Sequence, residues 1–378
     1  MVVNFLANCS VGSIALLPPY LHSLGASQTF VGLFNVLGIL MLVVVVLFFG
    51  RALVKLPRVK TMRWGYLITF VAYLLSWLAS GSLAWLAVFR VLGSVNQILS
   101  STLMVSTVLD LSPPDRRAGS LALFSVGGML TNPVTSVAGE AVVRVWGGPG
   151  LFLMGAGFGV AALAWSFLLR EPPVHESDER TPSALEVMAR PELRPLFLLT
   201  FAFGMYYSAL ATFLPHHTLD LLGEANLSAF MVPFSLVAIG IRVFLGKEFD
   251  RRPPRRFLHL SFLAILLALV SLLLPLGWWG LILAGLLYGV GHSVLFPLLN
   301  TLVVQRGPEA HKASFSNAFT VVNLISAIVT TPLLGLLGDL WGFPAIVTVL
   351  ALVAVGGFLV SRSTYPRPAE DPPSVHSS

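Results

Sequence analysis

The chain has 378 residues, of which 56% are hydrophobic, while 23 are Lys or Arg and 17 are Asp or Glu. Charged residues make up 11% of the chain, whereas a soluble domain has about 25%. This composition excludes an ordinary soluble enzyme, a nucleic-acid-binding module and a disordered chain, and the single Cys9 excludes a disulfide framework and a cysteine-based zinc site.

Apolar stretches long enough to cross a bilayer, which takes about 20 residues, recur along the whole chain. Six come first, at 3–22, 30–50, 65–82, 84–109, 118–142 and 149–169, and six follow at 195–222, 226–247, 257–275, 278–304, 313–338 and 342–361. They do not alternate in polarity, as β-barrel strands would. The first has no Lys or Arg before it, so we expect an uncleaved span rather than a signal peptide. The sequence therefore predicts an all-α membrane protein with twelve transmembrane helices.

The positive charges predict how these helices are oriented. All but two of the 23 Lys and Arg residues fall in alternate connections or in the tail, with Arg242 grouped in the basic cluster that follows the eighth stretch. The exceptions are Arg90, inside a stretch, and Arg144, at an outer end. Basic residues mark the cytoplasmic side, so we expect both termini inside and an integral protein of the bacterial inner membrane. The net charge of +6 then reflects topology and anionic lipid, not nucleic acid.

The two halves of the chain repeat each other at offsets of 196 to 199 residues. The matching pairs are Leu17-Pro18 with Leu214-Pro215, Gly50 with Gly246, Gly93 with Gly291, Pro133 with Pro332, and Gly139-Glu140 with Gly338-Asp339. This predicts an N-terminal six-helix bundle (1–169), a cytoplasmic linker (170–194) with a short surface helix near 183–189, a C-terminal six-helix bundle (195–361) and a cytoplasmic tail (362–378).

Several short motifs support a family resemblance. The segment after the eighth stretch reads Arg242-x-x-x-Gly246-Lys-Glu-Phe-Asp250-Arg251, and a degraded copy after the second has Val54 in the place of the acidic residue. Partial signatures also occur at Arg90-Val-Leu-Gly93, Gly128-x-x-x-Asn132-Pro133 and Tyr288–Pro297. The chain resembles the major facilitator superfamily of secondary transporters, and its bacterial efflux members in particular.

The resemblance implies a cytoplasmic latch, in which a carboxylate meets a helix end and paired arginines. Asp250 would be that carboxylate, with Arg242, Arg251 and Arg255 as partners. The full set of gating candidates is Gly50, Arg51, Arg58, Arg242, Gly246, Asp250, Arg251 and Arg255. The alternative is that these charges are solvated and only set the topology.

Polar residues inside the stretches are candidates for substrate binding or coupling. An ionisable group at membrane depth costs about 2.5–3.5 kcal/mol on insertion scales. Arg90 and Gln97 share a helical face that can bind a carboxylate, phosphate or hydroxyl; the alternative is that Arg90 has a structural role. His292 can carry a proton; the alternative is that it serves only in packing. The other candidates are Tyr206 and Tyr207 as an aromatic wall, the hydrogen-bonding amides of Asn8, Asn35, Asn300 and Asn323, and Glu140, which we expect near the outer interface rather than as the main proton carrier.

The sequence has no phosphate-binding loop, no nucleophile motif and no clustered metal ligands. We therefore expect no cofactor and no enzyme activity. The predicted function is secondary active transport of a small organic solute by alternating access, as proton-coupled efflux by an antiporter driven by the proton gradient. A sugar or metabolite importer or uniporter is the first alternative, and a membrane sensor without transport is the second. Expected partners are the solute and the lipid bilayer, with no nucleic acid, and the protein is expected to be a monomer.

Overall fold

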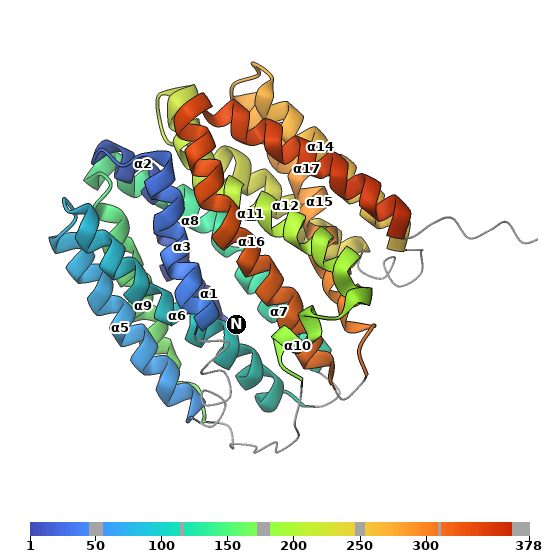
Figure 1. The fold of residues 1–378 in the computed structure, drawn as a ribbon. Helices are drawn as coiled ribbons and strands as arrows, with labels where there is room; N and C mark the ends of the chain where they lie inside the picture. The colour runs from blue at the N-terminus through green and yellow to red at the C-terminus, as the bar shows by residue number, and fades with distance from the viewer. Residues whose placement is uncertain (45–55, 114–116, 172–181, 246–253, 309–310, 365–378) are drawn as a thin grey trace, which may run out of the picture.

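The computed structural model describes residues 1–44, 56–113, 117–171, 182–245, 254–308 and 311–364, and every element within these ranges is a helix (Figure 1). The N-terminal half contains α1 (Val2–Gly12), η1 (Ser13–Leu16), α2 (Leu17–Ser23), α3 (Gln28–Val44), α5 (Arg58–Leu78), α6 (Leu83–Leu111), α7 (Arg117–Met129), α8 (Thr131–Trp146) and α9 (Gly150–Ser166). The C-terminal half contains α10 (Ala184–Met188), η4 (Pro191–Leu193), α11 (Arg194–Leu222), α12 (Ser228–Leu245), α14 (Pro254–Leu273), α15 (Trp278–Val304), α16 (Lys312–Trp341) and α17 (Phe343–Thr364).

Within the described residues, each of the apolar stretches predicted from the sequence contains a helix. Six described segments are long and apolar enough to cross a membrane, namely Val2–Ser23, Pro191–Leu222, Pro254–Leu273, Trp278–Val304, Lys312–Trp341 and Phe343–Arg362. Four shorter apolar helices cover 28–44, 83–94, 150–166 and 228–244. An all-helical, multi-pass membrane fold is confirmed, whereas the number of twelve spans stays a prediction.

Prolines break two of the stretches that were predicted as single helices. A 3₁₀ segment, Ser13–Leu16, separates α1 from α2, which carries proline in its first turn. The other interrupted stretch is the fifth, at 118–142. It divides at Leu130 into α7 and α8, three residues before Pro133. Because proline lacks an N–H and its ring crowds the carbonyl four residues earlier, the chain can continue in the same direction only after a local rearrangement of its hydrogen bonds.

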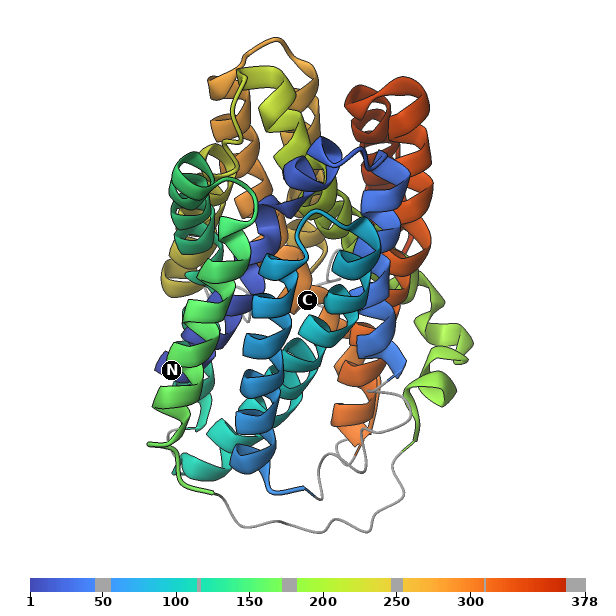
Figure 2. The same ribbon diagram turned by 90° about the vertical axis from the view of Figure 1, so that its left-hand side faces the viewer.

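The linker contributes a short helix that packs on the C-terminal half. Ser183 caps α10 by accepting a hydrogen bond from the Glu186 N–H at 3.2 Å. Val187 is fully buried, and α10 contacts the beginning of α16 (Figure 2). This is the short helix that the sequence predicts near 183–189.

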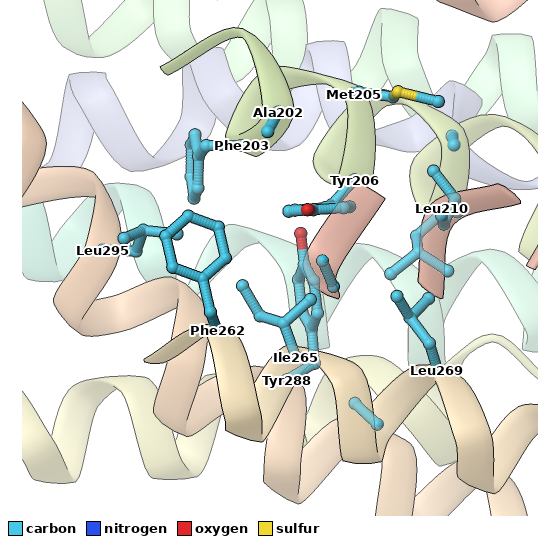
Figure 3. Packing of buried hydrophobic residues seen from close by; sticks show 14 of the residues in the cluster. Ala202, Phe203, Met205, Tyr206, Leu210, Phe262, Ile265, Leu269, Tyr288 and Leu295 are labelled. Carbon is cyan, nitrogen blue, oxygen red and sulfur yellow. The ribbon is translucent and has the colours of Figure 1, made fainter. Parts of the chain in front are cut away.

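The hydrophobic core differs between the two halves. In the C-terminal half, one continuous cluster joins α11, α12, α14, α15, α16 and α17, and it reaches Leu16 and Leu151 of the other half. Figure 3 shows part of it, with Phe262, Ile265 and Leu269 of α14 facing Tyr206 of α11 and Tyr288 of α15. The N-terminal half has two smaller separate clusters among its described residues, one that includes Tyr66 and one that includes Tyr73.

The two halves meet mainly at one end of the molecule. We call it the distal end, because it lies opposite the linker and contains the α2–α3, α8–α9, α11–α12 and α16–α17 connections; the other is the linker end. Here α3 runs beside α16 (Figure 1), α8 contacts α12, and α2 contacts α11. The contacts that join the halves therefore involve helices from both repeats in matching positions.

Candidate functional site

A carboxylate of α16 binds the beginning of α3 at the distal end. Asp339 accepts hydrogen bonds from the backbone N–H groups of Gln28, at 2.7 Å, and Thr29, at 2.9 Å. The Thr29 hydroxyl donates to the same carboxylate at 2.5 Å. The first N–H groups of a helix have no partner inside the helix and carry a partial positive charge. Asp339 therefore fastens a helix of the C-terminal half to a helix of the N-terminal half.

Glu140 of α8 makes the equivalent contact in the opposite direction. It accepts a hydrogen bond from the Ser228 N–H at 2.6 Å and another from the Ser228 hydroxyl at 2.7 Å, where α12 begins. Glu140 and Asp339 are partners in the internal repeat. Both oxygens of Glu140 are hydrogen-bonded to Ser228, so this carboxylate holds the two halves together at the distal end.

Glycines allow α3 and α16 to approach closely at this contact. A Cβ at Gly335 would lie 2.6 Å from the Gln28 carbonyl oxygen, and a Cβ at Gly32 would lie 2.8 Å from the Thr331 carbonyl oxygen. Side chains at either position would force the two backbones apart. The close packing of the distal end thus depends on residues that have no side chain.

Other contacts cross between the halves near the same end. Asn35 donates to the Thr212 hydroxyl at 3.1 Å, so this candidate amide lies between α3 and α11. The rings of His22 and His216 are stacked, with centroids 3.7 Å apart. Arg144 pairs with Glu224 at 3.3 Å on the surface. Together with the two carboxylates, these contacts close the distal end.

Aromatic rings surround His292 in the middle of the C-terminal half. Its centroid lies 4.9 Å from that of Phe203, 5.2 Å from those of Tyr207 and Phe234, and 5.4 Å from that of Tyr288. These residues come from α11, α12 and α15. Tyr207 remains 41% exposed in the middle of a long helix, and so this group borders an accessible space.

The two adjacent tyrosines of α11 face different surroundings, as their spacing requires. Tyr206 is fully buried, and the hydroxyl of Tyr288, which is also buried, points toward the Tyr206 ring (Figure 3). Neither hydroxyl has a hydrogen-bond partner among the described residues, and the same is true of His292 Nδ1. A buried polar atom without a partner costs about 1–3 kcal/mol. A polar ligand or a water molecule that formed hydrogen bonds with these atoms would recover that cost.

Two candidate amides on neighbouring helices are also unsatisfied within the described part of the chain. Asn323 Nδ2 on α16 has no hydrogen-bond partner and faces Gly204 on α11, where a Cβ would lie 3.1 Å away. Asn300 Oδ1 on α15 likewise has no partner. The predicted substrate-binding or coupling residues of the C-terminal half that have unpaired polar atoms thus lie on α11, α15 and α16.

Arg90 lies inside the N-terminal half. Its guanidinium carbon is 5.9 Å from the Phe34 ring centroid, and Nε has no hydrogen-bond partner within the described residues. The side chain borders a cavity of about 30 Å³ lined by residues of α1, η1, α2, α3, α5, α6 and α9, which can hold one or two water molecules. Arg90 therefore points into its own bundle in this conformation, instead of onto a solute-sized space.

The remaining interior candidates have different surroundings. Asn8 donates to the Asn4 carbonyl oxygen at 2.7 Å and to its side-chain oxygen at 2.8 Å, while Asn4 donates to the Phe124 carbonyl oxygen on α7. These amides therefore fasten α1 to α7. Gln97 belongs to α6, but its side chain lies outside the described part of the structure.

The structure places only part of the predicted gating set. Gly50, Arg51, Gly246, Asp250 and Arg251 lie outside the described residues. Arg58 is buried at the beginning of α5, and Arg255 lies in the first turn of α14.

Arg242 lies in the last turn of α12, within the predicted stretch 226–247. It is close enough to interact electrostatically with His292. Its grouping with the basic residues that follow the stretch gave no indication of this interaction.

A further carboxylate was missed by the sequence analysis. Glu171 follows α9 and accepts hydrogen bonds from Val59 N–H at 3.0 Å and Lys60 N–H at 3.1 Å, at the beginning of α5. It repeats the chemistry of Glu140 and Asp339, but within one half and at the linker end. A charged residue directly after an apolar helix gives no indication in the sequence of the helix it will bind.

Comparison with known proteins decides the family. The family model of the Major Facilitator Superfamily matches residues 1–331. The chain belongs to this superfamily. The staphylopine export protein of Staphylococcus aureus (strain Mu50) is 22% identical over 371 residues, which cover 92% of this chain and 91% of the relative.

Solved structures of transporters share the fold. A mutant of the nucleoside transporter NupG superposes with a TM-score of 0.79 at 14% identity, covering 96% of this chain and 98% of that one. A bacterial homologue of the human lysosomal transporter Spinster, in an inward-facing unoccupied conformation, gives a TM-score of 0.72 at 17% identity, covering 97% and 96%. The protein is therefore an integral, multi-pass membrane transporter for small molecules and not an enzyme.

Proposed function

We propose that this transporter exports a small organic solute from the cytoplasm by alternating access, in exchange for protons. The membrane is the bacterial inner membrane, both termini are cytoplasmic, and the distal end faces outward. In the described conformation the distal end is closed, which is the state in which an exporter loads solute from the cytoplasm. The proton gradient supplies the energy, and no cofactor is needed.

The observation that carries this proposal is a set of unpaired polar atoms on α11, α15 and α16, of which the His292 imidazole is one. Tyr206, Tyr288, His292 and Asn323 present hydroxyl, imidazole and amide groups without partners among the described residues. Aromatic rings line the same region. Binding sites for small organic molecules combine such apolar walls with a few polar groups that fix the orientation of the ligand, so these atoms supply the hydrogen bonds that a solute would complete.

His292 is the titratable member of this group. An imidazole changes its charge between about pH 5 and pH 8, and it can therefore hold a proton in one state of the cycle and release it in another. The exporter among the relatives supports the outward direction, because the staphylopine export protein matches nearly the full length of the chain.

Transport by the purified protein in proteoliposomes tests the proposal. A panel of labelled solutes is assayed with and without an imposed pH gradient, and then again with His292→Ala and with His259→Ala as the matched control. His259 is a histidine of the same half that contacts Phe358 and lies outside the aromatic group.

We expect His292→Ala to lose gradient-driven transport by at least about tenfold while it retains solute exchange without a gradient, and His259→Ala to behave as the parent protein does. A solute that moves without any response to the gradient would favour the uniporter, and accumulation with the gradient reversed would favour the importer. Either result contradicts proton-driven export.

A further inference from the structure

Two histidines from different halves are stacked at the distal end. His22 lies in the last turn of α2, and His216 lies in the last part of α11. Their ring centroids are 3.7 Å apart and the ring planes differ by 20°. The two rings thus touch face to face, and this contact joins the N-terminal half to the C-terminal half beside the carboxylate contacts of Glu140 and Asp339.

Two carboxylates, those of Asp220 and Asp339, face the pair. His216 Nε2 lies 3.6 Å from the Asp220 carboxylate, which is 60% exposed, and His216 Nδ1 has no hydrogen-bond partner in the described residues. His22 interacts electrostatically with His216, Asp220 and Asp339 and forms a hydrogen bond with the backbone of Ala26. Asp339 is already engaged by the beginning of α3. His217, the neighbour of His216, stacks instead on Phe343 of its own half.

This arrangement favours one proton over two. A single imidazolium can stack on a neutral ring and is balanced by the carboxylates of Asp220 and Asp339. Two imidazolium rings at this separation would repel each other by several times the thermal energy, even with the screening typical of a protein surface. The two rings touch directly, whereas Asp220 is exposed and Asp339 already accepts hydrogen bonds from Gln28 and Thr29, so the repulsion opposes the second proton.

We propose that His22 and His216 form a proton-binding contact that opens the distal end when both rings are protonated. The contact holds the halves together while at least one ring is neutral. On a more acidic outer side, a second proton enters and pushes α2 away from α11. The inference rests on the proposed function only for the side that supplies the proton; the response of the contact to pH belongs to the protein itself.

The test measures the width of the distal end directly, without solute or gradient. In a Cys9→Ala background, spin labels are attached through Gly81→Cys and Leu276→Cys. These positions lie in exposed distal connections of the two halves. The distance distribution between the labels is recorded in lipid nanodiscs at about pH 8 and about pH 5 for the full chain, for His22→Phe and for His216→Phe. His217→Phe is the matched control, because it removes a neighbouring histidine that does not cross between the halves.

We expect the population with the longer distance to rise at least about tenfold on acidification in the parent protein. Each of the two phenylalanine variants keeps a ring in the stack but cannot bind the second proton, so its distance distribution should stay the same at both pH values. His217→Phe should respond as the parent does. The proposal is wrong if the parent does not respond, if the response persists in His22→Phe and His216→Phe, or if it is lost only in His217→Phe.

The outcome is separable from that of the transport assay. A pH-dependent distal distance together with transport that ignores the pH gradient would reject proton-driven export and leave the histidine contact standing. Gradient-driven transport with a distal end that ignores pH would do the reverse. Failure of one proposal therefore cannot be mistaken for failure of the other.

Discussion

The distal end and the interior of the C-terminal half differ in whether their main polar groups have hydrogen-bond partners. At the distal end, Asp339 and Glu140 use their oxygens on the first N–H groups of a partner helix. In the interior, Tyr206, Tyr288 and His292 keep polar atoms without partners among the described residues. The two carboxylates of the first region are fully hydrogen-bonded in this conformation, whereas these hydroxyl and imidazole groups of the second are not.

We interpret this difference as follows. The contacts at the distal end hold one conformation, whereas the unpaired polar groups of the interior can bind a ligand. Satisfied contacts between the halves stabilise one state of the transporter and must break when the state changes. Unsatisfied groups in the interior cost stability, and that cost is recovered when solute or water binds. A mutation at the distal end should therefore alter the balance between states, whereas a mutation in the interior should alter binding and stability.

Gly335→Val should have the largest effect on the closed state. Its Cβ would lie 2.6 Å from the Gln28 carbonyl oxygen, and overpacking of this kind costs about 1–3 kcal/mol. We expect the closed distal population to fall about tenfold or more and transport to fall with it, as measured by the distance between labels at positions 81 and 276. Gly157→Val is the control, since a Cβ there meets nothing within 4 Å. Equal distances in the two variants would contradict this account of the helix contact.

Asp339→Asn and Glu140→Gln should each weaken closure to a smaller extent. An amide keeps one acceptor oxygen but loses the charge that favours a helix beginning, so about 1 kcal/mol is lost at each site. The double variant should open the distal end further than either single one. Glu171→Gln is the control, because its carboxylate binds α5 within the N-terminal half. If that variant changed the distal distance as much as Asp339→Asn does, the contact between halves would not be what sets closure.

Tyr206→Phe should sharpen the contrast by making the protein more stable and less active. The variant removes a buried hydroxyl that has no partner, and we expect a gain of up to about 1 kcal/mol in the free energy of unfolding, together with weaker solute transport. Tyr73→Phe is the matched change, since the Tyr73 hydroxyl donates to the Ser10 carbonyl oxygen at 2.5 Å. That variant should lose about 1 kcal/mol. Thermal unfolding in detergent distinguishes the two, and a loss in both would mean that Tyr206 is paired in solution.

Arg144→Gln should have the smallest effect. Its partner Glu224 lies 3.3 Å away, but the two side chains are 61% and 51% exposed. Exposed ion pairs contribute about 0–1 kcal/mol. The distal distance distribution of this variant should match that of the parent at physiological ionic strength, and a large shift would show that surface charge contributes more to closure than the carboxylates do.

Much of the architecture could be predicted from the sequence, because bilayer-length apolar runs and an internal repeat depend only on local composition and spacing. The matching of Gly139-Glu140 with Gly338-Asp339 also identified two carboxylates at corresponding positions of the repeat. The bonds they form could not be predicted, since the recipients, Ser228 and Gln28, carry no feature that distinguishes them from other residues at the beginning of a helix.

The candidate site was predicted less completely, for a physical reason. A polar residue in an apolar stretch is conspicuous in the sequence, and so Arg90, His292 and Asn35 were all found. Their directions depend on how the helices pack. Arg90 points into its own bundle, Asn35 donates a hydrogen bond to Thr212 across the two halves, and Arg242 acts electrostatically on His292. The roles assigned to the residues around His292 stay predictions until transport is measured.

The two reciprocal carboxylate contacts at the distal end resemble those of an isologous interface. In such an interface the same surface patch meets its own copy across a two-fold axis, so every contact occurs twice. In a dimer of identical subunits, one substitution would change both contacts at once. Here the two copies lie in one chain and have diverged, with Glu140 bound to Ser228 and Asp339 bound to Gln28 and Thr29. Joining the copies in one polypeptide therefore lets each side of the closure be adjusted independently of the other.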